Sequence, residues 1–218
     1  MKSRKRETHT ALRITGNFFA RSVYSGVILS VAGIINLLSE SRLAGALMFT
    51  IGLTSIFLLQ AFLYTGAVGN TVVEHKNGWW SWLLMMLLGN LLGCLIGALL
   101  TPLLYQGPEL MEAAQASWDL KVEQGTTRQL VSSSFCGCLV YVAWKANTKG
   151  SQRPLLSWFV IVLSIMVFVL ARFDHSIASA YLMFASGSYD LASWLCLLML
   201  LAGNTIGSVL PAAVFREE

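Results

Sequence analysis

Five consecutive residues, Arg172-Phe173-Asp174-His175-Ser176, lie inside a run that is otherwise free of charge from Pro154 to Tyr189. An imidazole beside a carboxylate can transfer a proton, and a guanidinium can bind an anion. In a hydrocarbon setting, ionisable side chains are costly unless they face a pore or a partner. The cluster therefore indicates a protein that moves a polar solute across a membrane.

The composition is that of a membrane protein. The 218 residues are 56% hydrophobic and 12% charged, whereas about 25% of residues in soluble domains are charged. A membrane-spanning helix needs roughly 20 apolar residues. The fourth apolar stretch is short, and we expect it to extend past Arg128 or Lys145, whose side chains can reach the interface. The sequence predicts an all-α polytopic membrane protein with six transmembrane helices, from the charge-free stretches 22–39, 43–73, 77–108, 129–144, 154–171 and 191–215.

The basic residues predict that both termini are cytoplasmic. In that orientation the outer segments carry only Arg42, Lys121 and Arg128, while Arg172 lies within the membrane. The net charge of +4 then reflects topology in a lipid bilayer, and no nucleic-acid partner is expected. The other basic residues fall on the cytoplasmic side: Lys2, Arg4, Lys5, Arg6, Arg13, Arg21, Lys76, Lys145, Lys149, Arg153 and Arg216.

Two runs, 43–73 and 154–189, are too long for one straight span and too short for two. Each has polar or small residues part-way along, at 60–70 and at 172–188. A broken helix with a loop at membrane depth explains both runs. Unwound backbone is tolerated there only where it is buried in protein or lines a wet cavity. The alternative is a long tilted helix that continues into a loop.

The motif Gly89-Asn90-x-x-Gly93 recurs as Gly203-Asn204-x-x-Gly207, and each copy follows a broken run. Three spans per half is an odd number, so the halves enter the membrane from opposite sides. This predicts two inverted three-helix repeats with a site near the midplane between them. The single channel domain, 1–218, then divides into a cytoplasmic N-terminal segment, a first repeat, an outer loop with an amphipathic helix, and a second repeat: 1–20, 21–105, 106–124 and 125–215.

An enzyme and a neutral-solute pore are the alternatives from other classes. An intramembrane enzyme could use Asp174 and His175 as a dyad, but it would also need a nucleophile or a set of metal ligands. The spacing of Cys136 and Cys138 is not that of a zinc site. We therefore expect no enzymatic activity, no metal and no cofactor. An aquaporin-type pore would carry paired Asn-Pro-Ala loops, and the sequence has none.

Over roughly 40–215 the sequence resembles the formate/nitrite transporters. The most specific stretch, FVLARFDHSIA at 168–178, resembles the family's Phe-Glu-His-Ser-(Ile/Val)-Ala motif in the broken fifth helix. Leu63-Tyr64-Thr65 resembles the Leu-Phe-Thr of the loop that breaks the second helix, and Val140–Trp144 resembles the end of the fourth span. Both Gly-Asn-x-x-Gly motifs match the third and sixth spans of the family.

The resemblance implies an aquaporin-like protomer that assembles as a homopentamer in the bacterial inner membrane, with a pore in each protomer. Its substrate would be a small monovalent weak-acid anion such as formate, nitrite or hydrosulfide. By the same resemblance, His175 would be the central pore histidine facing Thr65, with Asn204 as a polar neighbour. Lys121 falls near a vestibule lysine that attracts anions.

The resemblance also implies two pore constrictions. Phe49, Leu53 and Phe168 fall where the family builds its cytoplasmic constriction, and Leu63 and Tyr64 fall near the periplasmic one. The sequence departs from the family at several positions. Asp174 replaces a glutamate, Arg172 replaces a small residue, Cys136 replaces an asparagine and Phe62 replaces an acid. Arg172 could pair with Asp174 or bind anions.

These residues suggest a mechanism based on proton transfer. An unpaired charge in a low-dielectric constriction costs on the order of tens of kcal/mol in the ideal limit. A proton removes most of that cost, and histidine titrates in the physiological range. We expect the anion to enter beside Lys121, take up a proton at His175 and Thr65, and then pass the apolar constriction as the neutral acid. A purely structural His175 at a helix break is the alternative.

Overall fold

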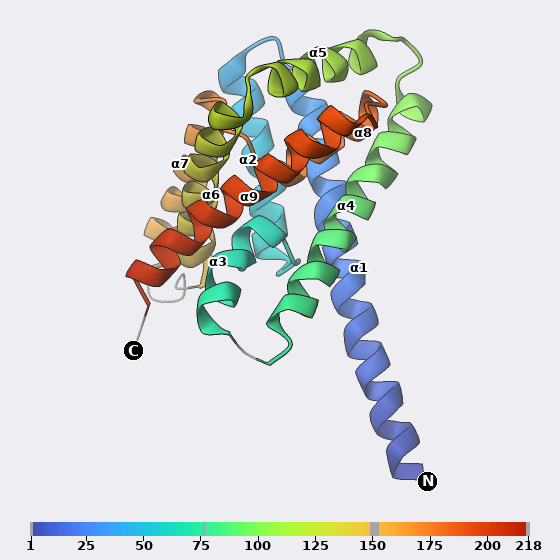
Figure 1. Cartoon of the computed structure of the whole chain (residues 1–218), viewed down its shortest axis with the longest axis vertical. Coiled ribbons are helices and arrows are strands. Elements are labelled where there is room, and N and C mark those ends of the chain that lie inside the picture. Colours follow the sequence, from blue (N-terminus) through green and yellow to red (C-terminus); the bar gives the residue numbers. More distant parts are fainter. Residues whose placement is uncertain (1, 76, 149–152, 217–218) are drawn as a thin grey trace.

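The computed structural model is all-helical over the residues that it describes, 2–75, 77–148 and 153–216, and its side chains are described from residue 16 onward (Figure 1). The predicted all-α class is therefore confirmed. Several basic side chains used to predict topology lie outside the described residues: Lys2, Arg4, Lys5, Arg6, Arg13, Lys76 and Lys149. The helices are α1 (Lys2–Leu38), α2 (Arg42–Leu58), α3 (Tyr64–Glu74), α4 (Trp79–Leu104), α5 (Glu109–Glu123), α6 (Thr126–Thr148), α7 (Pro154–Leu170), α8 (Ser176–Ala185) and α9 (Leu191–Val214).

Three of the described helices are long and apolar enough to cross a membrane: Gly16–Leu38 within α1, and the whole of α4 and α9. Large apolar side chains also face outward, and Leu103 is 76% exposed. Soluble proteins rarely expose apolar surface on this scale, whereas lipid accepts it. The helix α6 extends past both Arg128 and Lys145, as the sequence predicts. The predicted boundary at residue 20 falls inside α1, so the N-terminal segment continues directly into the first apolar helix.

The two long apolar runs each form two helices in place of one. The run 43–73 is divided between α2 and α3, with residues 59–63 between them. The run 154–189 is divided between α7 and α8, with residues 171–175 between them. Neither run therefore forms one continuous helix in the structure.

The first helix of each pair ends with the same backbone motif. Gln60 and Arg172 adopt left-handed backbone conformations, with φ of 51° and 58°. In each case the following residue donates its N–H back to a carbonyl five residues earlier, which is the Schellman pattern that satisfies the last carbonyls of a helix. The equivalent bonds are Ala61 N–H to the Ile56 oxygen and Phe173 N–H to the Phe168 oxygen, both 2.9 Å.

The repeated glycines bring pairs of helices to backbone contact. A Cβ atom added at Gly93 would meet the carbonyl oxygen of Val23 and the Cα of Gly26. A Cβ atom at Gly207 would meet the carbonyl oxygen of Ser134. Small residues are used in membranes for such close approach. They allow α4 to pack against α1 and α9 to pack against α6.

The helix α5 lies across one end of the bundle, and the starting residues of α1 and the last residues of α9 lie at the other end (Figure 1). One face of α5 is buried, including Leu110, Ala114 and Trp118. The indole N–H of Trp118 donates to the Ser193 hydroxyl oxygen at 2.9 Å. The amphipathic helix predicted within 106–124 is therefore present, and it is fixed over the α8 and α9 side of the bundle.

The contact at Gly93 predicts the effect of a single methyl group. We expect Gly93→Ala to destabilise the protein by about 1–3 kcal/mol, because the new atom has to displace backbone of α1. Thermal unfolding in detergent measures this as a lower midpoint. Gly16→Ala is the matched control, since no heavy atom lies within 4 Å of its added Cβ. Equal midpoints for the two variants would contradict this prediction, because they would show that α1 and α4 can move apart at no cost in stability.

Candidate functional site

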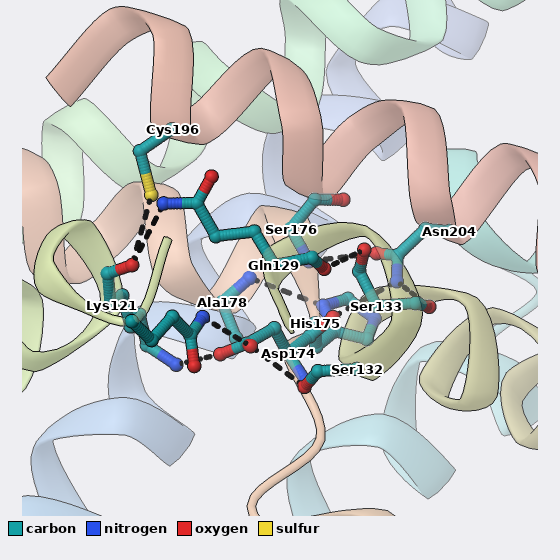
Figure 2. A network of polar contacts seen from close by, with 11 residues as sticks. Lys121, Gln129, Ser132, Ser133, Asp174, His175, Ser176, Ala178, Cys196 and Asn204 are labelled. Atoms are coloured by element: carbon teal, nitrogen blue, oxygen red, sulfur yellow. Dashed lines mark hydrogen bonds and ion pairs between the residues drawn. The ribbon is translucent and has the colours of Figure 1, made fainter. Parts of the chain in front are cut away.

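His175 lies at the break between α7 and α8, where its side chain caps the first turn of α8. Its Nδ1 accepts a hydrogen bond from the N–H of Ala178 at 3.2 Å (Figure 2). Its Nε2 lies 2.9 Å from the hydroxyl oxygen of Thr65. Because Nδ1 is an acceptor, the neutral ring carries its hydrogen on Nε2 and donates it to Thr65. The structure thus brings together the two residues that the sequence predicts to face each other.

Two aromatic rings lie next to His175. The ring of Phe168 stacks on the imidazole, with centroids 5.8 Å apart and planes at 25°. The ring of Phe49 meets Phe168 edge-on, with centroids 5.9 Å apart. Both phenylalanines are buried. The imidazole therefore has an apolar surface on one face and a hydroxyl group at its edge.

Asp174 is buried and fully paired. It forms an ion pair with Lys121 of α5, and its other carboxylate oxygen accepts bonds from Gln124 Nε2 at 2.9 Å and from the Ser132 hydroxyl at 2.7 Å. The Ser132 oxygen in turn accepts the N–H of Asp174 at 3.1 Å. Figure 2 shows Lys121 and Ser132 converging on this carboxylate. Lys121 is therefore the cation that pairs with Asp174, and the pairing with Arg172 that the sequence leaves open does not form.

Asn204 holds the same break from α9. Its Oδ1 accepts the N–H of Ser176 at 2.7 Å. Its Nδ2 donates to the carbonyl oxygens of Ser133 at 2.7 Å and Asp174 at 2.9 Å (Figure 2). The side chain is fully buried, and these bonds occupy its amide. In the structure, Asn204 therefore holds the backbone around His175 in place. The resemblance instead implies that its side chain is a polar group on the path of the solute.

Asn90 makes the equivalent contacts at the other break. Its Oδ1 accepts the N–H of Tyr64 at 2.9 Å, and its Nδ2 donates to the carbonyl oxygens of Ser22 at 2.8 Å and Phe62 at 2.9 Å. Each Gly-Asn-x-x-Gly motif therefore places an amide where the second helix of a pair begins. The hydroxyl of Tyr64 also lies 3.0 Å from the hydroxyl of Thr205 on α9, so a polar contact joins α3 to α9.

A cavity of about 640 Å³ reaches from α5 to His175, and its lining includes Lys121, Phe49 and Phe168. We predict from the sequence that both rings lie beyond His175 as seen from Lys121, whereas in the structure both line the cavity that reaches from α5 to His175. The reason is the direction of the helices: Phe49 lies in the half of α2 nearer to α5, and Phe168 lies in the last turn of α7. Both rings therefore belong to the wall of the cavity that also reaches His175. Leu53 and Leu63 are buried and do not line this cavity.

Arg172 is exposed and lines the same cavity, and within the described ranges its side chain has no hydrogen-bond or ion-pair partner.

Sequence reasoning missed Gln124 and Ser132, the other partners of Asp174. The partners of Asn90 and Asn204 do have a sequence signal. A second motif, Ser-x-x-x-Gly, occurs at Ser22–Gly26 and again at Ser133–Gly137. The carbonyl oxygens of its two serines accept the hydrogen bonds of the two asparagines.

The described residues contain no group of three or more His, Cys, Asp or Glu side chains that could hold a metal ion. The four cysteines are free thiols in the described part of the chain, and three of them are buried. The groups available for chemistry at the site are therefore one imidazole, hydroxyl groups, the Lys121–Asp174 ion pair and the arginines that line the cavity.

Comparison with known proteins gives consistent results. The sequence profile described as formate/nitrite transporter matches residues 3–216. A solved pentameric formate channel with formate bound shares the fold with a TM-score of 0.74 and 19% identity, covering 93% of this chain and 94% of that chain. A solved FNT family ion channel matches with a TM-score of 0.75 and 20% identity, covering 95% and 90%. No protein with a curated description matches significantly.

The Lys121–Asp174 pair predicts strong coupling between two substitutions. Removing one partner of a buried ion pair costs about 3–5 kcal/mol, and the lower end applies here because Lys121 is 20% exposed. We expect Lys121→Met and Asp174→Asn each to lower the thermal midpoint in detergent. The double variant should be more stable than the sum of the two losses predicts, by at least about 1 kcal/mol. Simple additivity of the two losses would contradict the pairing.

Proposed function

Because the chain belongs to the formate/nitrite transporter family, we propose that it forms a channel for a small monovalent weak-acid anion such as formate or nitrite. The observation that carries this proposal is the arrangement of His175. A buried imidazole bonded to Thr65 lies at the inner end of a cavity with cationic walls, behind the Phe49 and Phe168 rings.

We also propose that the channel has six spans in two inverted repeats, 21–105 and 125–215, with the broken helices α2–α3 and α7–α8 as the second and fifth spans. Equivalent Schellman endings and equivalent asparagine contacts support this arrangement. The directions support it as well, since α2 begins and α8 ends toward α5, whereas α3 and the start of α7 lie toward the opposite end (Figure 1).

The proposed assembly is a homopentamer in the bacterial inner membrane, with both termini in the cytoplasm and α5 on the outer side. One of the solved structures with this fold is a pentameric formate channel. The distribution of basic residues supports the orientation. In this orientation the cavity beside Lys121 opens toward the periplasm.

The proposed mechanism begins with the anion in that cavity. The anion approaches past Phe49 and Phe168, whose apolar rings replace its water and raise the cost of its charge. An anion beside the imidazole stabilises the imidazolium form. The ring takes a proton that cavity water relays from the outer solution and gives a proton to the anion. One anion and one proton thus enter together, the acid proceeds without charge, and the ring returns to its neutral form. Leu53, Leu63 and Tyr64 then form the second constriction.

Flux measurements in proteoliposomes test this function. The solutes are formate, nitrite, hydrosulfide, chloride and glycerol, between about pH 5 and pH 8. We expect one weak-acid anion to pass at a rate that rises as pH falls, because more of it crosses as the neutral acid. Chloride, which accepts no proton in this range, should pass poorly. Glycerol or chloride flux without pH dependence would instead identify an uncoupled pore.

The variant His175→Asn tests the role of the imidazole. Asparagine is a favoured N-cap residue, so α8 should keep its first turn and the protein should fold. We expect the weak-acid flux to fall by roughly 100-fold and to lose its pH dependence, since the proton donor is gone. His75→Asn is the matched control, because His75 is exposed at the end of α3. Unchanged flux and pH dependence in folded His175→Asn would leave the histidine a structural role only.

A further inference from the structure

The cavity beside α5 has an unbalanced charge. Its only acidic lining residue is Asp174, and its other lining residues, apart from the cations and His175, are uncharged. Asp174 and Lys121 neutralise each other in their ion pair. Three guanidinium groups therefore remain in the lining without a compensating acid, those of Arg42, Arg128 and Arg172.

The acids of α5 do not correct this imbalance. The helix contributes Ala113, Ala116, Ser117, Leu120 and Lys121 to the lining. Its four acidic residues are absent from the lining: Glu109, Glu112, Asp119 and Glu123. The helix thus places its negative charge away from the cavity and its one basic side chain within it. The three arginines consequently line a cavity whose only acidic lining residue is already paired with Lys121.

The fold does not require a cation at residue 172. Arg172 and Gln60 occupy the same position of the two Schellman endings, with the same left-handed backbone. The uncharged Gln60 completes that motif equally well. The guanidinium of Arg172 is therefore available for a role in the cavity, since it has no partner among the described residues.

We propose that Arg42, Arg128 and Arg172 form a binding site for a divalent oxyanion, such as sulfate or hydrogen phosphate, and that its occupant blocks the channel. The block rests on the proposed function. A guanidinium binds two oxygens of one oxyanion through its fork of N–H donors. One formate leaves most of the three positive charges uncompensated, whereas a divalent oxyanion neutralises two of them. A cavity of about 640 Å³ has room for such an ion with part of its hydration.

A divalent oxyanion that binds there cannot follow the substrate. One proton from His175 turns formate into a neutral acid but leaves a divalent ion with one charge. On the proposed path the rings of Phe49 and Phe168 precede His175, so a divalent ion meets them with two charges where formate has one, and its desolvation cost there is larger. Beyond His175 its remaining charge keeps that cost at the second constriction. The ion therefore occupies the cavity and stops at the rings. The site separates weak monovalent acids, which pass, from divalent oxyanions, which bind and obstruct.

The experiment combines binding and flux on the full chain in lipid. Sulfate is titrated into protein in nanodiscs by calorimetry, and formate flux into proteoliposomes is measured with sulfate on either side. We expect wild-type protein to bind sulfate and to lose formate flux as sulfate occupies the side that bears α5. Labelled sulfate itself should not cross. We expect Arg172→Gln and Arg128→Gln each to weaken sulfate binding and block by roughly tenfold, because each removes a charge-assisted contact.

Arg153→Gln is the matched control, with the same charge change at the start of α7 and outside the cavity. It should bind sulfate as the wild type does. Equal weakening in this control, unaltered binding in both cavity variants, absence of sulfate binding to the wild type, or passage of sulfate would each overturn the inference. Arginine-dependent sulfate binding by a protein that passes no monovalent anion would support the site and overturn the proposed function instead.

Discussion

The structure depends on satisfying the backbone at two interruptions between helices inside an apolar bundle, the first between α2 and α3 and the second between α7 and α8. Each break exposes N–H and carbonyl groups that lipid cannot satisfy. Schellman bonds satisfy the last carbonyls of α2 and α7, and one asparagine amide then takes the first free groups of the following helix. Asn204 bonds the N–H of Ser176 and the carbonyl of Asp174, the residues on either side of His175. The position of the imidazole is therefore fixed through the backbone, and its two nitrogens bond Ala178 and Thr65.

The buried carboxylate has a comparable purpose on the α5 side. Asp174 links the break to α5 through Lys121 and to α6 through Ser132. An isolated buried carboxylate would be strongly unfavourable, and these partners compensate for its burial. The pairing also determines the electrostatics of the cavity, because it uses the only acid in the lining and the only lysine. What remains for a solute is the positive charge of the arginines.

The sequence predicts the parts of this site that have a local signature. An ionisable cluster in an apolar run identifies the break at residues 171–175, and the repeated glycine motif identifies α4 and α9 as equivalent helices. Pairings across the bundle have no local signature, so the contact of Lys121 with Asp174 and the depth of Phe49 and Phe168 could not be derived. Those features depend on the direction in which each half-helix enters the bundle. The resemblance predicts the two rings beyond the histidine, whereas in the structure they line the cavity that reaches from α5 to His175.

The capping role of His175 links its proton chemistry to the fold. In the neutral ring, Nδ1 accepts the N–H of Ala178 and Nε2 donates to Thr65. An imidazolium carries hydrogen on both nitrogens, so Nδ1 can no longer accept and the first turn of α8 loses its cap. Protonation of the ring therefore costs this hydrogen bond, and under the proposed function the attraction between the imidazolium and an anion in the cavity offsets that cost. In the proposed mechanism, a proton therefore resides on the ring mainly when an anion is present to receive it, which couples the two without a separate gate.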